Sequence, residues 1–495
     1  MAFAITQTCC NDASCVAVCP VNCIHPTPDE PDFGKTDMLY VDPRACIDCG
    51  ACADACPVDA IFPVESLTEP LKAYAGINAE FYAEREPAAN ADPAPNFHAW
   101  GPPSFTRTIP SDFPAPRVAV VGTGPAGMYA VEDLLLHTSA KVTLIDRLPV
   151  TGGLVRYGVA PDHPSTKKIG ETFARLHRHP RLRLQLGVEV GKDVSVAELE
   201  DRYDAVIYAV GASSARGLGI PGEDLPGSLA ATTVVGWYNG HPDVRPDAVD
   251  LSAERVVLVG TGNVALDVAR ILTADPETLA GTTISPEALA RLRCSKVREV
   301  VLLARRGPEN AAYTEPELLA LKQEGGPQLV VDTHDPRIAE TIDSATTGKA
   351  RLLRDVPREA VDWSAPPPHG QRRIVLRFHS APAEIVGDRQ VRGTRVTAAD
   401  GETEIVAGQV IRAVGYRGTA LPGLPFDEET GTVPNTAGRV DGVPGAYVVG
   451  WIKRGPSGGI GANRSCSAET VGTLLDDIVS GKVSVAPRRS LLRRR

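Results

Sequence analysis

Cysteine is the residue type that points most directly to chemistry in this chain of 495 residues. All but two of its 11 cysteines, Cys294 and Cys466, lie between Cys9 and Cys56. The later half of that stretch has the spacing C-x2-C-x2-C-x3-C-P, formed by Cys46, Cys49, Cys52, Cys56 and Pro57. In iron–sulfur proteins with this spacing, the loop supplies three thiolates to one cluster, and the cysteine before proline binds the other cluster of a pair. A zinc site would need two C-x2-C pairs farther apart, so the spacing predicts iron–sulfur clusters.

The earlier half of the stretch repeats the motif with one change, because Asp12 stands where the second cysteine would be. Crossing over the fourth ligands gives one site of Cys19, Cys46, Cys49 and Cys52, and another of Cys9, Cys15 and Cys56 with Asp12 or nothing. Three thiolates hold three irons well, and a carboxylate is a poor ligand for a fourth. We therefore predict one [4Fe–4S] and one [3Fe–4S] cluster. The alternative is two [4Fe–4S] clusters with Asp12 or Cys10 as the odd ligand; otherwise Cys10 and Cys23 are expected to be structural.

The charge of the chain is concentrated in the same region. Residues 1–63 hold nine Asp and Glu side chains against Lys35 and Arg44, a net charge of −7 out of −10 for the whole chain. A small acidic domain is typical of an electron carrier that docks on basic partners, although solubility alone would also explain it. The negative balance argues against a nucleic-acid surface. The N-terminus has no signal-peptide pattern, and no apolar run approaches the roughly 18 to 20 residues of a membrane span, so we expect a cytoplasmic protein.

A glycine turn behind an apolar strand is the second feature with chemical meaning. Arg117–Val121 predicts the strand, and Gly122, Gly124 and Gly127 of a G-x-G-x-x-G motif follow it. These glycines permit a tight turn and let a pyrophosphate approach the N-terminus of the next helix, where free N–H groups attract anions. The next predicted strand ends in Asp146, 19 residues after Gly127, where an acid can bind ribose hydroxyls. This order predicts a dinucleotide site rather than a purely structural turn.

The chain carries a second such turn. Arg255–Val259 predicts a strand that precedes GTGNVA (260–265), in which alanine replaces the third glycine, as the fingerprint allows. The next paired strand, expected at Val297–Ala304, ends in Arg305 and Arg306 instead of an acid. Arginine at this position suits the 2′-phosphate of NADP through charge-assisted hydrogen bonds, whereas an acid would favour NAD. The alternative is a pair of surface arginines.

Repeats and composition divide the chain into parts. VAVVGTGPAG (118–127) is echoed by VVLVGTGNVA (256–265), and AVIYAVGA (205–212) by QVIRAVGY (409–416). We expect an α/β protein with two Rossmann-like dinucleotide-binding domains, the second inserted in the first, preceded by a small α+β bacterial ferredoxin domain. The expected bounds are 1–63 for the ferredoxin, 64–116 for a Pro/Ala-rich linker, 117–226 and 409–495 for the first nucleotide domain, and 227–408 for the second.

The chain also resembles known proteins over nearly its whole length. Residues 117–495 resemble ferredoxin–NADP reductases of the adrenodoxin-reductase type, through GLVRYGVAPDHP (153–164), GTGNVALDVARIL (260–272), ARRGP (304–308) and GWIKRGPSGGIGAN (450–463). Residues 1–63 resemble the seven-iron ferredoxins, but the spacing from Cys9 to Cys15 is shorter than in their commonest form. Together the resemblances point to the bacterial fusions of a ferredoxin with a ferredoxin–NADP reductase.

The resemblance implies FAD in the first nucleotide domain, NADP in the second, and the residues that bind each. FAD contacts would fall on Gly122, Gly124, Ala126, Gly127, Asp146, Leu154, Val190, Trp451, Gly458, Gly459 and Ile460. NADP contacts would fall on Arg216, Thr261, Gly262, Asn263, Val264, Arg305, Arg306, Glu317 and Gly458. His163 would lie near the flavin and either pass a proton or only have an orienting role. Ala320 stands where some relatives carry a second acid, so the role of that acid does not transfer.

The reaction implied by the resemblance is ferredoxin–NADP(+) reduction. NADPH would give a hydride to the flavin, and electrons would pass singly through the clusters to or from a ferredoxin-type carrier or a cytochrome P450, with His163 as the candidate catalytic residue. Trp451 would cover the flavin edge.

One alternative is an electron-input subunit of a larger enzyme of glutamate-synthase type, and another is a non-enzymatic redox sensor. A disulfide reductase would need a C-x2-C pair near the flavin, and Cys294 and Cys466 are single and far apart.

Replacing Arg305 and Arg306 by alanine should raise the KM for NADPH about 10- to 100-fold, because a hydrogen bond to a charged group contributes ~1.5–3 kcal/mol. The KM for NADH, which lacks the 2′-phosphate, should change little. Steady-state kinetics with both nucleotides measures the difference. Equal losses with NADPH and NADH would contradict the assignment of these arginines to the 2′-phosphate.

Overall fold

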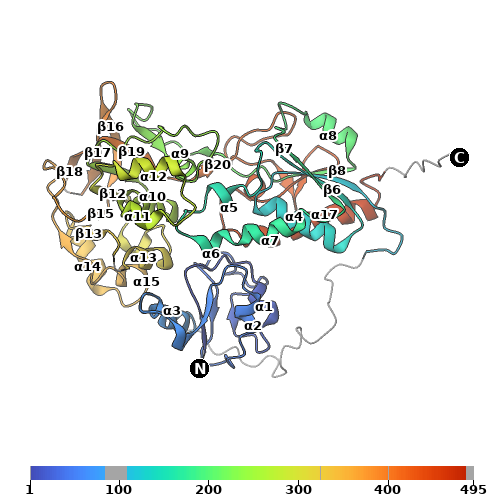
Figure 1. Cartoon of the computed structure of the whole chain (residues 1–495), viewed down its shortest axis with the longest axis horizontal. Coiled ribbons are helices and arrows are strands. Elements are labelled where there is room, and N and C mark those ends of the chain that lie inside the picture. The colour runs from blue at the N-terminus through green and yellow to red at the C-terminus, as the bar shows by residue number, and fades with distance from the viewer. Residues whose placement is uncertain (1, 84–108, 324, 400, 486–495) are drawn as a thin grey trace.

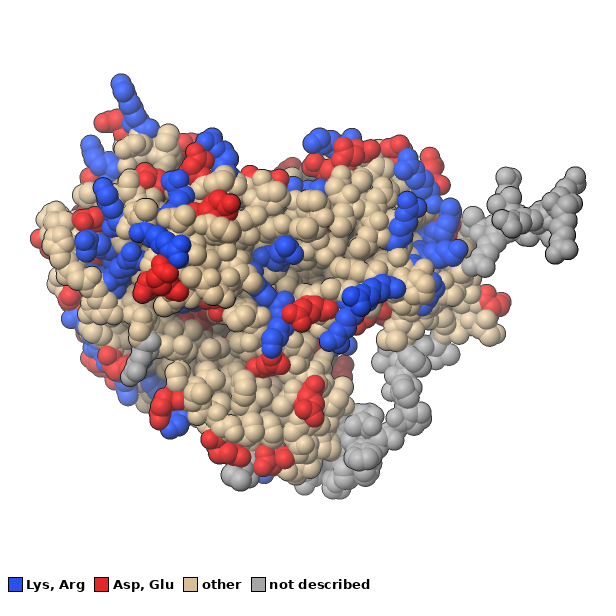
Figure 2. Space-filling model, in the orientation of Figure 1, with Lys and Arg blue, Asp and Glu red and all other residues tan. Residues whose placement is uncertain are grey.

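The computed structural model describes residues 2–83, 109–323, 325–399 and 401–485. They form two lobes, each built on a seven-stranded sheet, and a small N-terminal module. The lobes lie side by side, and the module lies below them, against the region where they meet (Figure 1). Acidic side chains mark the visible face of the module (Figure 2). Within the described residues, no helix is long and apolar enough to cross a membrane.

The N-terminal module consists of two similar halves. β1 (Phe3–Ile5) pairs antiparallel with β4 (Ile61–Pro63), and β2 (Ile24–His25) pairs antiparallel with β3 (Tyr40–Val41). Helix α1 (Ser14–Val18) contains the buried Cys15 and ends at Cys19, and helix α2 (Ala51–Ala55) contains the buried Cys52 and ends at Cys56. Both helices therefore place one cysteine inside the module and a second at their C-terminal end. This is the internal repeat that the cysteine spacing predicts.

The segment after β4 folds back onto the module through two 3-10 turns (Val64–Ser66 and Glu69–Leu71) and helix α3 (Ala73–Phe81). Asn78 of α3 is buried, and its Oδ1 accepts hydrogen bonds from the N–H groups of Ile5 (3.1 Å) and Val41 (2.9 Å). Its Nδ2 donates to the carbonyls of Ile5 and Tyr74, both at 2.8 Å. The expected linker of 64–116 thus begins with a helix that packs on the module, while most of its proline-rich stretch, up to residue 108, lies outside the described residues.

The first lobe has the sheet order β21-β22-β23-β8-β5-β6-β7, with its central strands parallel. The central strands of such a sheet are mostly apolar, because helices cover both faces, and every residue of AVIY (205–208) is buried. Helices α4 and α17 pack together, and the Ser467 hydroxyl of α17 donates to the Ala126 carbonyl of α4 (2.8 Å). The strands are β5 (Arg117–Val121), β6 (Lys141–Asp146), β7 (Leu182–Leu186), β8 (Ala205–Tyr208), β21 (Asn435–Thr436), β22 (Arg439–Val440) and β23 (Ala446–Val448). The helices are α4 (Pro125–His137), α5 (Leu154–Tyr157), α6 (Pro164–Lys167), α7 (Ile169–Leu176), α8 (Val196–Arg202), α16 (Trp451–Arg454) and α17 (Ala462–Val479).

The second lobe has the sheet order β10-β19-β11-β12-β15-β13-β14, all parallel, and carries a separate antiparallel sheet of β16, β17 and β18. The strands are β10 (Ser228–Ala230), β11 (Arg255–Val259), β12 (Glu299–Leu303), β13 (Gln328–Asp332), β14 (Arg358–Glu359), β15 (Arg373–Arg377), β16 (Ala381–Gly387), β17 (Val391–Ala398), β18 (Gly401–Val406) and β19 (Gln409–Arg412). The helices are α9 (Ala231–Tyr238), α10 (Asn263–Thr273), α11 (Pro276–Leu279), α12 (Pro286–Arg293), α13 (Glu315–Leu321), α14 (Pro336–Ser344) and α15 (Gly348–Arg351).

The chain crosses between the lobes through β9 (Ser214–Ala215) and β20 (Tyr416–Arg417), which pair antiparallel. The second lobe is therefore inserted in the first, as predicted. The predicted bound between residues 408 and 409 needs correction, because β19 pairs with β10 and β11 in the second sheet. The sequence repeat explains the difference: β19 lies beside β11 as β8 lies beside β5. The similarity of QVIR to AVIY reflects equivalent places in two sheets, not membership of one.

Replacing Asn78 by alanine should destabilise the module by about 2–4 kcal/mol, because buried backbone N–H groups lose their acceptor and each costs ~1–3 kcal/mol when unsatisfied. The expected result is earlier loss of the visible iron–sulfur absorbance in guanidinium, with the unfolding of the reductase part unchanged. Ala79→Ser, at the exposed next position, is the control and should behave as the wild type. Unchanged cluster loss in Asn78→Ala would show that α3 does not stabilise the module.

Candidate redox site

The first cysteine site is a cavity inside the module. Its lining comprises Ile5, Cys9, Cys10, Asp12, Cys15, Leu39, Cys56, Val58, Ala60 and Ile61. Cys56, from the later motif, thus lies with Cys9 and Cys15 from the earlier one, which is the crossed-over arrangement described above. Burial raises the pKa of Cys9 to about 11 and also raises the pKa of Cys15 well above its usual range. Buried thiols in an apolar lining fit a metal cluster, because bound iron would supply the positive charge that stabilises their thiolate forms.

Asp12 lies at the edge of this cavity, where other groups contact its carboxylate. The Ser14 N–H donates to its Oδ1 (3.3 Å), and the Ser14 hydroxyl donates to its Oδ2. The Arg464 guanidinium lies 3.5 Å from the same Oδ2. Neighbouring Cys10 is buried, and burial raises its pKa well above the usual range. The donors around Asp12 come from the protein, so its oxygens already have partners without an iron.

The second cysteine site gathers Cys19, Cys46, Cys49 and Cys52. Burial, followed by the charges of Cys19 and Cys46, raises the pKa of Cys52 to about 12. Cys23, assigned only a structural role from the sequence, lies at this site as well, because its Sγ is 3.5 Å from the Sγ of Cys19. Its hydrogen bond to Cys19 raises the pKa of Cys23. Cys49 is exposed, so this site reaches the surface of the module, whereas the cysteines of the first site are buried or half-buried.

The turn between β5 and α4 is shaped for a dinucleotide. A Cβ on Gly127 would lie 2.0 Å from the Gly122 carbonyl oxygen, so only glycine lets the helix approach the turn this closely. Asp146, at the end of β6, has its Oδ2 held by the N–H (2.8 Å) and hydroxyl (2.5 Å) of Thr123. The acid predicted to bind ribose therefore lies beside the glycine turn.

The other residues expected at FAD come from three separate segments. A Cβ on Gly153 would lie 2.8 Å from Gly124, which places the segment containing Leu154 against the turn. Val190 is buried in the same apolar cluster as Val121 and Ile145. The Trp451 indole N–H donates to the carbonyls of Ser457 (3.1 Å) and Gly458 (3.2 Å), which fixes the ring over the loop of Gly458, Gly459 and Ile460. Gly450 lies against Ala126 of α4.

The residues expected at NADP surround the turn between β11 and α10. Asn263 Oδ1 accepts from the Thr314 N–H (2.8 Å), and Thr261 Oγ1 accepts from the Ala312 N–H (3.3 Å). These bonds tie the turn, with Gly262 and Val264, to the segment that leads into α13 and Glu317. Arg305 and Arg306 are exposed directly after β12. Arg216 lies instead at the crossing between the lobes, where its Nε donates to the Tyr416 carbonyl (3.2 Å).

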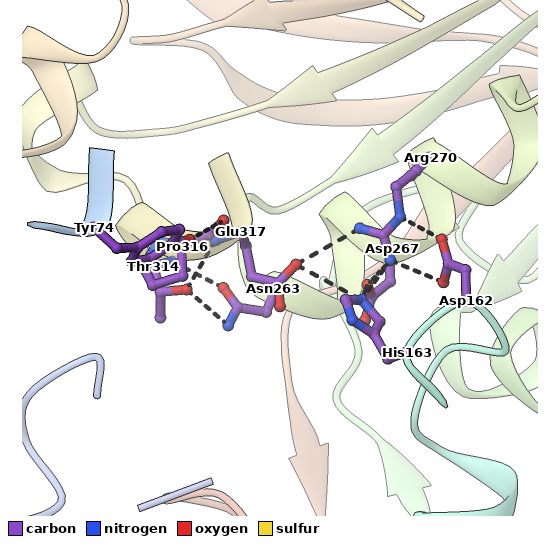
Figure 3. Close-up of polar contacts among 9 residues, drawn as sticks. All are labelled: Tyr74, Asp162, His163, Asn263, Asp267, Arg270, Thr314, Pro316 and Glu317. Atoms are coloured by element: carbon purple, nitrogen blue, oxygen red, sulfur yellow. Dashed lines mark hydrogen bonds and ion pairs between the residues drawn. The ribbon is translucent and has the colours of Figure 1, made fainter. Parts of the chain in front are cut away.

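His163 belongs to a partly buried ionic network between the lobes (Figure 3). His163 Nε2 lies 3.1 Å from Asp267 Oδ1 and 4.0 Å from Glu317 Oε2. Arg270 pairs with Asp162 through Nε–Oδ2 (2.7 Å) and Nη2–Oδ1 (3.1 Å), and its Nη2 also lies 2.5 Å from Asp267. Asp162 and His163 precede α6 of the first lobe, whereas the other three residues lie on α10 and α13 of the second.

The charged groups of this network change one another's pKa values. Burial would lower the pKa of His163, but the hydrogen bond and charge of Asp267 outweigh burial and raise it. Burial, with a smaller contribution from the Asp267 charge, raises the pKa of Glu317 to about 7. His163, Asp267 and Glu317 lie close enough to hold a metal ion, but the Arg270 guanidinium already places a positive charge among these acids.

Sequence reasoning named His163 and Glu317 but missed Asp162, Asp267 and Arg270. All three missed residues lie within the quoted segments APDHP and GTGNVALDVARIL. The signal available was Asp267 and Arg270 at i and i+3, which share one face of a helix. Nothing local in the sequence could show that this face meets Asp162 of the other lobe.

The chain is similar to several known proteins. The sequence matches the family described as pyridine nucleotide-disulphide oxidoreductase over residues 116–306, and the 4Fe-4S binding domain over residues 39–62. It is 47% identical to a probable ferredoxin/ferredoxin–NADP reductase of Mycobacterium tuberculosis (strain H37Rv) over 498 residues, which cover 98% of this chain and 85% of the relative. It is 38% identical to the mitochondrial NADPH:adrenodoxin oxidoreductase of Mus musculus over 416 residues, covering 78% and 83%. The solved structure of Mycobacterium tuberculosis FprA in complex with NADPH matches with a TM-score of 0.69 and 41% identity, covering 76% of this chain and 88% of that one.

Glu317 should make NADPH binding sensitive to pH. Below about pH 7 Glu317 is neutral, and above it the side chain gains a negative charge that repels the anionic nucleotide. The ratio of the wild-type KM for NADPH to that of Glu317→Gln should therefore rise several-fold between about pH 6 and about pH 8. Glu309→Gln, which changes an exposed acid of the same lobe, is the control and should keep the wild-type profile. A ratio that stays flat with pH would mean that Glu317 does not titrate in this range.

Proposed function

The chain belongs to the family of ferredoxin/ferredoxin–NADP reductases. From this premise we propose which part of the chain binds each cofactor and which part transfers electrons in an NADPH-dependent ferredoxin reductase. The first lobe takes FAD, the second takes NADPH, and the module exchanges single electrons with a carrier. The observation that carries the proposal is the partly buried network of Asp162, His163, Asp267, Arg270 and Glu317, which joins the lobes. Hydride transfer needs both nucleotides to meet at one junction, and these side chains hold the two lobes together there.

In the first lobe, the chain binds and orients the flavin cofactor. When bound, FAD supplies hydride acceptance and single-electron release. Asp146, already oriented by Thr123, would bind ribose hydroxyls, and the N–H groups at the start of α4 would bind the pyrophosphate. The fixed indole of Trp451 covers the entrance used by the nicotinamide.

In the second lobe, the chain selects the nucleotide and sets its position. Arg305 and Arg306 bind the 2′-phosphate through charge-assisted hydrogen bonds. The ion pair of Arg270 with Asp162 fixes the position of the second lobe relative to the first. His163 Nε2 lies at the junction between Asp267 Oδ1 (3.1 Å) and Arg270 Nη2 (2.6 Å), so this nitrogen of the first lobe contacts two side chains of the second.

The two cysteine sites are proposed to hold different clusters. Cys9, Cys15 and Cys56 hold a [3Fe–4S] cluster, because the Asp12 oxygens already accept from Ser14 and face Arg464. Cys19, Cys46, Cys49 and Cys52 hold a [4Fe–4S] cluster, with Cys23 beside it. A ferredoxin-type carrier or a cytochrome P450 is the external partner, and the cytoplasm, where NADPH is available and thiols stay reduced, is the proposed location.

An anaerobic titration of the purified protein with NADPH, followed by absorbance and EPR, tests this function. The flavin should bleach and the cluster signals should change in step with it. The oxidised sample should also show a three-iron EPR signal. If the flavin bleaches while the clusters stay oxidised, the module is not the direct electron acceptor. The absence of a three-iron signal from the oxidised protein would overturn the assignment of the first site.

A further inference from the structure

The module contacts the reductase with the segment that carries its first cysteine site. The Gly461 N–H donates to the Cys10 carbonyl at 2.8 Å. A Cβ on Gly461 would lie 2.1 Å from both the carbonyl carbon and the carbonyl oxygen of Asn11. Only glycine therefore allows the two backbones to meet here, and the contact joins the first site to the loop just after Ile460.

Arg464, one turn into α17, makes the side-chain contact at the same place. Its Nη1 donates to the Ser14 hydroxyl (2.8 Å) and lies 3.5 Å from Asp12 Oδ2. The Asp12 side chain is 10% exposed and the Arg464 side chain 49% exposed, so water reaches this charge pair from the Arg464 side. The guanidinium also lies over the Tyr129 ring of α4, 5.9 Å from its centroid, which fixes the direction in which Arg464 points.

Further contacts set the orientation of the module against both lobes. Asp59, three residues after Cys56, pairs with Lys168 of the first lobe. Asp37 Oδ2 accepts from the Glu315 N–H at the start of α13 (2.9 Å), and Glu80 pairs with Arg351 (3.2 Å) in the second lobe. Contacts to both lobes leave the module little freedom to rotate while it is docked.

The first site is also continuous with the loop of Gly458, Gly459 and Ile460 in its apolar packing. Ile460 packs against an apolar cluster that contains the buried Cys10 and Cys15 and extends to Cys19 and Cys52 of the second site. The second site differs in its outer side, where Ile47, Asp48, Cys49 and Asp54 are exposed. The docked module thus turns one site inward and leaves the other open to solution.

We propose that Arg464 is a positioning residue that, with Gly461, docks the first cysteine site of the module against the flavin-side loop, so that electrons cross between reductase and module at this site and leave through the second. The inference rests on the proposed function, which places the flavin beside Gly458–Ile460. In the direction of NADPH oxidation, NADPH loses two electrons and a proton as a hydride. The module takes the electrons one at a time and passes each to an oxidised carrier, and the proton is released.

Arg464→Glu tests the contact, because it places a negative charge against Asp12. After rapid mixing of the holoenzyme with NADPH, flavin bleaching should proceed as in the wild type, and cluster reduction should slow at least tenfold. Hydrogen exchange in peptides that span residues 9–15 should rise, which reports undocking independently of turnover. Arg202→Glu, on the exposed helix α8, is the matched control and should match the wild type in all three measurements.

A second pair of variants tests the alternative that electrons enter the module at the second cysteine site. Asp48→Lys and Asp54→Lys change the exposed charges at the second site and should slow the reduction of added basic cytochrome c, while leaving cluster reduction by NADPH within twofold. Slowed cluster reduction in these variants, with normal rates in Arg464→Glu, would overturn the proposal. Where Arg464→Glu does not assemble its clusters, Arg464→Gln replaces it, with the same direction expected. If NADPH does not bleach the flavin of the wild type, the proposed function itself is refuted. Failure of the proposed function can therefore be distinguished from failure of the docking proposal.

Discussion

The ion pair between Arg270 and Asp162 is the contact on which the rest of this enzyme depends, because two chain crossings alone do not fix two lobes against each other. Arg270 makes two hydrogen bonds to Asp162 across the junction and one to Asp267 on its own helix. The guanidinium needs acceptors for its N–H groups, and displacement of one lobe would separate Arg270 and Asp162, whose side chains are 12% and 22% exposed, with a penalty in free energy because both are partly shielded from water. The relative position of the nucleotide sites follows from that penalty.

The same network reaches the module through α13. Glu317 lies in the network, and two residues earlier the Glu315 N–H bonds to Asp37 of the module. Between them, the Pro316 carbonyl accepts from the hydroxyl of Tyr74 on α3 (3.4 Å). The helix that carries an acid of the junction thus has its first turn held by the module. Docking of the module and the position of Glu317 are consequently parts of one packing arrangement.

The sequence predicts what depends on local spacing. The cysteine motifs, the glycine turns and the acid at Asp146 follow from chemistry that operates within about 20 residues of chain. The contacts of Arg270 with Asp162 and of Gly461 with Cys10 join segments 108 and 451 positions apart, and no local pattern contains them. The bound at residue 408 was wrong for a related reason, since strands of similar sequence occupy equivalent places in two different sheets. The sequence predicts only a structural role for Cys23. Its Sγ lies 3.5 Å from the Sγ of Cys19, and the spacing of the cysteines could not show this contact.

Asp12 links the cluster chemistry to the fusion of the two proteins. A cysteine at this position would complete the ligand set of the first site, but its thiolate would be bound to iron and Arg464 would face Ser14 without a carboxylate. With Asp12 the first site lacks a fourth thiolate, but the carboxylate provides a negative charge that faces Arg464 of the reductase. A tether keeps the module at high effective concentration, so a modest contact is enough to select one docked orientation among many. On this argument, the change that distinguishes the first motif from the second is suited to a module that always meets the same reductase.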